Sequence, residues 1–124
     1  MKAFMDKEFL LSNETGSRLF HDYAEQCPII DYHNHLSPKD IFERRRYRNL
    51  TQLWLEGDHY KWRCMRVCGV PEELVTGKAP DWDKFLAFAT ILPRLIGSPV
   101  YHWAHLELKR YFDISTTLRE KTAK

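Results

Sequence analysis

One short segment, residues 28–36, is the only part of the sequence with the pattern of a β-strand. Ile29 and Ile30 open it, as in a buried strand, and Pro38 begins a helix soon after it. A lone strand leaves its backbone N–H and C=O groups unpaired unless other strands flank it. We therefore expect this segment to join a sheet whose other strands lie outside the chain, which would make the chain a piece of something larger.

Two histidines, His33 and His35, stand near the end of this segment. Side chains alternate along a strand, so both would share one face with Asp31. Such a pair is close enough to bind one metal ion, and (β/α)8 barrels carry their chemistry at the C-terminal ends of their strands. Asp31 would then either orient a histidine ring or act as a structural acceptor. The spacing alone also fits two histidines in a polar turn.

The rest of the sequence has the apolar periodicity and the capping residues of helices. Ser12 or Asn13 caps a first helix that ends before Pro28, and Ser115 predicts a last helix that continues to Lys124. Between them, caps, prolines and glycines predict helices over 37–46, 49–57, 58–69, 81–97 with a kink or a break at Pro93, and 98–112. We expect Asp81 to cap the fourth of these.

A second chemically dense stretch surrounds the start of the helix that Asp58 caps. It brings an acid–base candidate, His59, and a phenol, Tyr60, together with the cations Lys61, Arg63 and Arg66. Helix N-termini attract anions through their N–H groups and the helix dipole. A carboxylate-bearing substrate would suit this place, although an ordinary capped helix with a polar first turn has the same composition.

Charge and composition exclude several classes of function. The net charge is +2, which gives no argument for binding nucleic acid or a membrane surface. No apolar run approaches the roughly 20 residues of a membrane span, and no signal peptide is evident. With three cysteines, an odd number, we expect a cytoplasmic protein with reduced thiols. The pairs Cys64/Cys68 and His102/His105 have spacings that permit metal binding, but ordinary packing explains them better.

Several segments together resemble the N-terminal part of the uronate (glucuronate) isomerase family of the amidohydrolase superfamily. The stretch GDHYKWRCMR at 57–66 is far more specific than the two histidines. The other matching segments are FMDKEFLL (4–11), PIIDYHNHLSP (28–38), YHW (101–103) and LELKRYF (106–112). The resemblance covers nearly the whole chain in the same order.

The resemblance implies an α/β fold of which this chain is one part. We expect the N-terminal fragment of a metal-dependent-hydrolase-like (β/α)8 barrel, mostly helical here, with one barrel strand near 28–36. A complete barrel needs about 250 residues, twice the 124 present. Residues 1–37 would be the arm, first helix and first strand, residues 38–112 a helical insertion, and residues 113–124 the start of a helix returning to the barrel.

The resemblance also implies an aldose–ketose isomerase that interconverts D-glucuronate with D-fructuronate, and D-galacturonate with D-tagaturonate. His33 and His35 match the metal ligands, with zinc as the expected divalent metal, and His59 and Tyr60 match residues that reach the sugar. The remaining ligands and the substrate-binding arginines are absent from this sequence, so we expect the isolated chain to be inactive. We expect the protein to form a homo-oligomer.

Two other functions remain open on the sequence alone. A hydrolase of the same superfamily would share His33 and His35 but would activate a metal-bound water. A truncated, non-catalytic interaction module would use its exposed helices instead. The stretch around His59 argues against the hydrolase, whereas solution behaviour would test the module.

Overall fold

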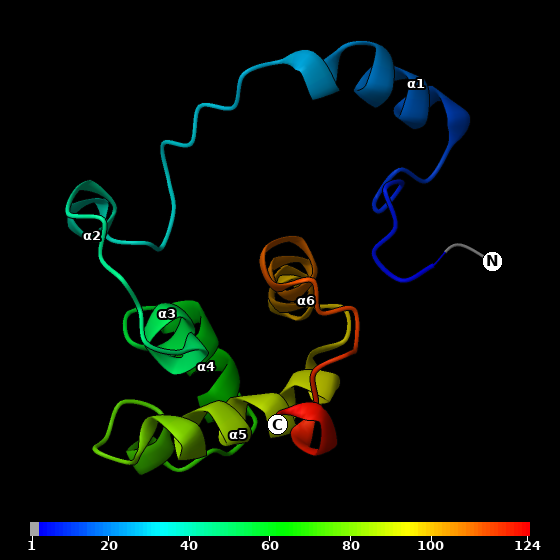
Figure 1. Ribbon diagram of the computed structural model, residues 1–124. Helices are drawn as coiled ribbons and strands as arrows, with labels where there is room; N and C mark the ends of the chain where they lie inside the picture. Colours follow the sequence, from blue (N-terminus) through cyan, green and yellow to red (C-terminus); the bar gives the residue numbers. More distant parts are fainter. Residues whose placement is uncertain (1–2) are drawn as a thin grey trace. The chain divides into compact units, whose positions relative to one another are not determined.

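The computed structural model describes residues 3–124, and helices are the only regular elements within that range (Figure 1). Internal contacts divide the chain into two compact units, one that ends at Asn34 and one from His35 to Lys124. No helix in the described range has the length and apolar character needed to cross a membrane. Residues 28–34 adopt neither helix nor strand, so the barrel strand expected there stays a prediction.

The first unit is built on α1 (Glu14–Asp22), which is followed by the short η1 (Ala24–Gln26). Asn13 caps α1, since its Oδ1 accepts a hydrogen bond from the Gly16 N–H at 2.8 Å. Glu8 ties the N-terminal arm to this helix, because its carboxylate accepts from His21 Nε2 at 2.9 Å and from Ser17 Oγ at 3.0 Å. The helix itself buries no residue, so its apolar stripe stays exposed.

The second unit begins with three capped helices and a short 3-10 turn. They are α2 (Pro38–Phe42), α3 (Leu50–Leu55), α4 (His59–Val67) and η2 (Glu72–Leu74). Ser37, Asn49 and Asp58 accept hydrogen bonds from backbone N–H groups in the first turns of α2, α3 and α4. The three caps confirm the predicted helix starts.

The longer helices follow in the second half of this unit. They are α5 (Asp81–Ile91), η3 (Leu92–Leu95), α6 (Pro99–Phe112) and η4 (Glu120–Thr122). Pro93 lies where the α-helix passes into a 3-10 turn, because proline lacks the N–H that an α-helix needs. Ser98 caps α6 by accepting from the Val100 N–H at 3.3 Å, as predicted.

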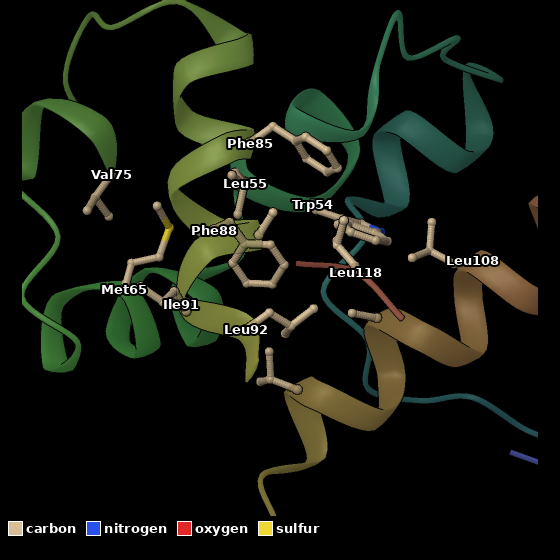
Figure 2. Close-up of a cluster of buried hydrophobic side chains, with 13 residues drawn as sticks. Trp54, Leu55, Met65, Val75, Phe85, Phe88, Ile91, Leu92, Leu108 and Leu118 are labelled. Atoms are coloured by element: carbon tan, nitrogen blue, oxygen red, sulfur yellow. The ribbon is translucent and has the colours of Figure 1, made fainter. Parts of the chain in front are cut away.

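A single apolar core joins these helices, and α5 lies at its centre. Helix α5 contacts α3, α4, η2, η3 and η4. Figure 2 shows Phe88 in the middle of the cluster, with Trp54 from α3 and Met65 from α4 beside it. The buried members are Trp54, Leu55, Met65, Val75, Phe85, Phe88, Ala89, Ile91, Leu92, Val100, Ala104, Leu108 and Leu118.

The first helix ends at Asp22, earlier than the predicted end before Pro28. The extents of two further elements were also predicted wrongly, and side-chain competition explains both. Helix α2 ends at Phe42 rather than near residue 46, because Arg44 takes a left-handed conformation (φ 52°) and Arg45 turns back to pair with Asp40 at 3.1 Å. The predicted helix from Ser115 is reduced to the turn η4, because the Leu118 N–H donates to His105 Nε2 at 2.9 Å instead of to a helical carbonyl.

The predicted cap of α5 was also wrong. Pro80 precedes the helix without a side-chain cap, and Asp81 is the first helical residue. Its carboxylate accepts instead from Asn49 Nδ2 at 2.9 Å, and its carbonyl oxygen accepts from Thr51 Oγ1 at 2.6 Å. Asp81 therefore connects α5 to the start of α3, a tertiary role that local spacing does not reveal.

Replacing Phe88 with alanine should destabilise the second unit by about 3–5 kcal/mol, because the ring is fully buried and a cavity would remain. Chemical denaturation followed by circular dichroism would measure the loss. The same substitution at Phe42, which is 88% exposed, is the matched control and should change the free energy of unfolding by less than about 0.5 kcal/mol. Equal effects at the two positions would contradict this core.

Acid should weaken the anchoring of the C-terminal segment through His105. Burial lowers the pKa of His105, whose Nδ1 donates to the Tyr101 carbonyl and whose Nε2 accepts from Leu118. As pH falls below the ordinary histidine pKa of about 6.5, the unfolded chain takes up this proton first, so the free energy of unfolding decreases until the folded-state pKa is passed. Denaturation midpoints between about pH 8 and 5 would measure this slope.

A variant pair isolates the contribution of His105 from that of other titrating groups. His105→Gln should reduce the acid-dependent slope. The matched control is His102→Gln, which also removes a histidine from α6 and should retain the slope. His21 titrates with the opposite sign, because its hydrogen bonds with Glu25 and Glu8 raise its pKa. An unchanged slope in His105→Gln would show that another group is responsible.

Candidate functional site

The start of α4 is held rigidly by contacts on both sides of its first turn. The Trp62 indole donates to the Leu55 carbonyl at 2.6 Å, which fixes the turn between α3 and α4. One turn further along, Met65 is completely buried in the core. The side chains of residues 58–61 therefore project from a backbone that the core positions.

Three aromatic rings gather at this helix start. The His35 ring stacks on the Tyr60 ring with a centroid distance of 4.6 Å and an interplanar angle of 10°. The His59 ring lies 5.0 Å from His35 and 4.8 Å from Tyr60. The structure thus brings together three of the four site residues that the sequence proposed, all within the unit from His35 to Lys124.

The carboxylate of Asp58 contacts this ring cluster and has three partners. Its Oδ1 accepts from His35 Nδ1 at 3.0 Å and from the Tyr60 N–H at 3.0 Å, while its Oδ2 accepts from Lys61 Nζ at 2.6 Å. Burial disfavours the charged form of Asp58, but the hydrogen bonds from Lys61 and His35 outweigh it and hold the pKa of Asp58 below its ordinary value. The carboxylate is therefore ionised at neutral pH.

Sequence reasoning treated Asp58 only as a helix cap and missed its contact with His35. The available local signal was the i, i+3 spacing of Asp58 and Lys61, which permits an ion pair on one helix face. The contact with His35 spans 23 residues and is visible only in the folded chain. Conversely, Asp31 accepts from the backbone N–H of His33 at 3.2 Å, which is the structural role that the sequence left open for it.

The cations of this stretch have separate tasks. Lys61 is 7% exposed and pairs with Asp58, so it is not presented to a ligand. Arg66 pairs with Glu72 at 2.5 Å, and this pair together with Thr76 lowers the pKa of Glu72 to about 2. Arg63 lies over the Tyr60 ring, 5.6 Å from its centroid, and is the cation of the three that remains at the exposed surface beside the rings.

The fourth proposed site residue, His33, belongs to the first unit. Within residues 3–124, no group of three or more His, Cys, Asp or Glu side chains is arranged to bind a metal. His35 nevertheless fits a metal ligand chemically, since metal-binding histidines commonly donate their second ring N–H to a carboxylate, as His35 does to Asp58.

Neither the pairs Cys64/Cys68 and His102/His105 nor a groove on the surface of the second unit belongs to the ring cluster of His35, His59 and Tyr60. Both ring nitrogens of His105 are engaged within the protein, and burial raises the pKa of the Cys64 thiol, so neither is prepared to bind zinc. An open groove between α5 and the segment that follows α4 is lined by residues that include Cys68, Leu86 and Arg94. The ring cluster does not contribute to that groove.

Comparison with known proteins gives one consistent result. The family model described as glucuronate isomerase matches residues 1–124. Proteins named uronate isomerase from Bacillus pumilus and Brachyspira hyodysenteriae are 58% and 57% identical over 123 residues, which is 99% of this chain and 26% of each relative. A crystal structure of uronate isomerase from Thermotoga maritima matches with a TM-score of 0.89 and 41% identity, covering 98% of this chain and 27% of that one. The chain therefore spans about a quarter of the length of these relatives.

Replacing Lys61 with methionine should destabilise the second unit by about 3 kcal/mol, because it leaves the Asp58 carboxylate largely buried without its cation. The matched control is Lys39→Met, whose pair with Glu43 is exposed and 3.9 Å long, and this change should cost less than about 0.5 kcal/mol. Chemical denaturation measures both. The double variant Lys61→Met/Asp58→Asn should recover part of the loss, and purely additive effects would contradict the coupling.

Proposed function

The chain belongs to the glucuronate isomerase family, and on that premise we propose that the protein is a uronate isomerase. It would interconvert D-glucuronate with D-fructuronate, and D-galacturonate with D-tagaturonate, in uronate catabolism. The observation that carries this proposal is the match of the whole chain to one family of that activity, at 41% identity and a TM-score of 0.89 to a solved member. The cluster of His35, His59 and Tyr60 on one rigid helix start supports it.

We propose that residues 28–36 form the first strand of a (β/α)8 barrel and residues 38–112 a helical insertion after it. Ile29 and Ile30 are 93% and 84% exposed, and apolar residues of this size favour burial against neighbouring strands. The other strands would come from polypeptide that the longer relatives possess. A cytoplasmic location and assembly into a homo-oligomer stay predictions.

His33 and His35 are the residues proposed to hold a divalent metal, which we take to be zinc. Catalytic zinc normally has three protein ligands, so further ligands would come from beyond the described residues. The metal would supply Lewis-acid stabilisation of negative charge on the substrate oxygens. This assignment rests on the family resemblance and on the carboxylate partner of His35.

The isomerisation moves a proton between C1 and C2 of the sugar and also requires hydroxyl protons to be moved. His59 and Tyr60 are both exposed at the start of α4, where a sugar can reach them. The His59 imidazole can accept or return a proton, and the Tyr60 hydroxyl can donate a proton to a substrate oxygen or accept one from it. Their stacking with His35 keeps both side chains at one point of the surface.

Replacing Tyr60 with phenylalanine in the full-length enzyme should lower kcat by about 100-fold, since general acid–base groups contribute 10² to 10⁴. KM and the far-ultraviolet circular dichroism should change little, because the ring that stacks on His35 is retained. Turnover of D-glucuronate provides the measurement. Tyr111→Phe, at an exposed tyrosine on α6, serves as the control and should behave as the unmodified enzyme.

Two results would contradict parts of this function. Unchanged turnover in Tyr60→Phe would remove the Tyr60 hydroxyl from the chemistry. Hydrolysis of an amide or ester substrate without turnover of uronates would instead favour the metal-dependent hydrolase.

A further inference from the structure

Asp58 caps α4 and also contacts the side chains of His35 and Lys61. We propose that Asp58 is a positioning residue, held by Lys61, that fixes the His35 ring in its Nδ1–H tautomer and so prepares Nε2 to bind a divalent cation. The cation-binding role of His35 rests on the proposed function, whereas the tautomer assignment rests on the contacts of this chain. An N-terminal cap alone would not require the contacts with His35 and Lys61.

The carboxylate of Asp58 is fixed by three hydrogen bonds of different origin. The backbone N–H of Tyr60 and the ring of His35 both donate to Oδ1, each at 3.0 Å, and the Lys61 ammonium donates to Oδ2 at 2.6 Å. Two of these donors belong to α4, which the buried Met65 anchors in the core. The position of the carboxylate is therefore set by the helix, and the His35 ring is oriented against it.

The charge of Asp58 determines which tautomer of His35 is stabilised. An ionised carboxylate can only accept hydrogen bonds, so the His35 Nδ1 that faces it must carry the proton. The lone pair of the neutral ring then resides on Nε2, the nitrogen that would bind the cation. The Tyr60 ring, stacked at 4.6 Å and nearly parallel, restricts rotation of the imidazole out of this orientation.

Lys61 completes the arrangement by holding the second carboxylate oxygen of Asp58, since its ammonium donates to Oδ2 at 2.6 Å. Its side chain is 9% exposed and that of Asp58 13%, so water screens the pair only weakly. By contrast, the side chains of the surface pair Lys39–Glu43 are 75% and 55% exposed. Lys61 is therefore buried with its partner, unlike a typical surface lysine. We therefore assign Lys61 to the support of Asp58 rather than to recognition of an anionic substrate.

Two substitutions at Asp58 separate positioning from helix capping. Asp58→Ser and Asp58→Asn both retain side chains that cap helices well. Serine is too short to reach His35, and asparagine has no charge and can satisfy either tautomer through its oxygen or its amide group. Asp81→Asn is the matched control, because Asp81 also stands at a helix start but contacts Asn49 and Thr51 instead of a histidine.

The first readout is the ¹⁵N spectrum of the histidine rings in metal-free, full-length protein at about pH 8, above the ordinary histidine pKa. A His35→Gln variant assigns the His35 signals. We expect a protonated Nδ1 and an unprotonated Nε2 in the unmodified protein and in Asp81→Asn. Asp58→Ser and Asp58→Asn should show a mixture in which the Nε2–H form is populated.

The second readout is the affinity for Zn²⁺ alone, measured by competition with a chromophoric chelator. The two Asp58 variants should bind Zn²⁺ about 10- to 100-fold more weakly than the unmodified protein, the usual effect of losing the partner of a metal-binding histidine. Asp81→Asn should bind normally. Circular dichroism should show the same helix content in all variants.

The outcomes distinguish this inference from the proposed function. If His35 has the same tautomer with and without Asp58, or if the tautomer changes but Zn²⁺ affinity does not, the positioning role is overturned. If His35→Gln leaves Zn²⁺ affinity unchanged, the assignment of His35 as a ligand in the proposed function fails, and the tautomer spectrum still decides whether Asp58 controls the ring. Loss of the Nδ1–H tautomer of His35 in the two Asp58 variants, together with weaker Zn²⁺ binding, supports the proposal.

Discussion

Burial of one face of α5 is the interaction on which the rest of the second unit depends. Phe88 and Ala89 of this helix are fully buried, and the helices packed on them are individually too short to be stable in water. Helices α3 and α4 have 6 and 9 residues, so their stability comes from the apolar side chains that they place against α5. Removing water from these side chains is the dominant favourable term.

The same core determines where the chemical groups lie. Met65 anchors α4 from within, and the Trp62–Leu55 hydrogen bond sets the turn before it, so the first turn of α4 has little freedom. On this turn Asp58 and Lys61 form a protected ion pair, and His59 and Tyr60 remain exposed. A protected ion pair and two exposed ring side chains thus lie within one turn of the same helix, because side chains on a helix project in different directions.

Much of the fold could be predicted from local patterns, and the failures have a common cause. The caps Asn13, Ser37, Asn49, Asp58 and Ser98 were predicted correctly because each satisfies backbone N–H groups within its own helix. The last helix was predicted wrongly because His105, distant in sequence, takes the N–H of Leu118. The cap at Asp81 failed for a related reason, since its carboxylate is drawn to the start of α3.

For the candidate site, too, local patterns identified some features and tertiary contacts decided the others. The sequence by itself determined the identity of the family and the helix start at Asp58, and it proposed His33, His35, His59 and Tyr60 as site residues, because residue type and short spacing are local properties. Only the tertiary structure decided that His35 stacks on Tyr60, that Asp58 accepts from the His35 ring, and that Lys61 is buried rather than offered to a substrate. These contacts depend on how α4 packs on the core, and packing joins residues that no local pattern connects.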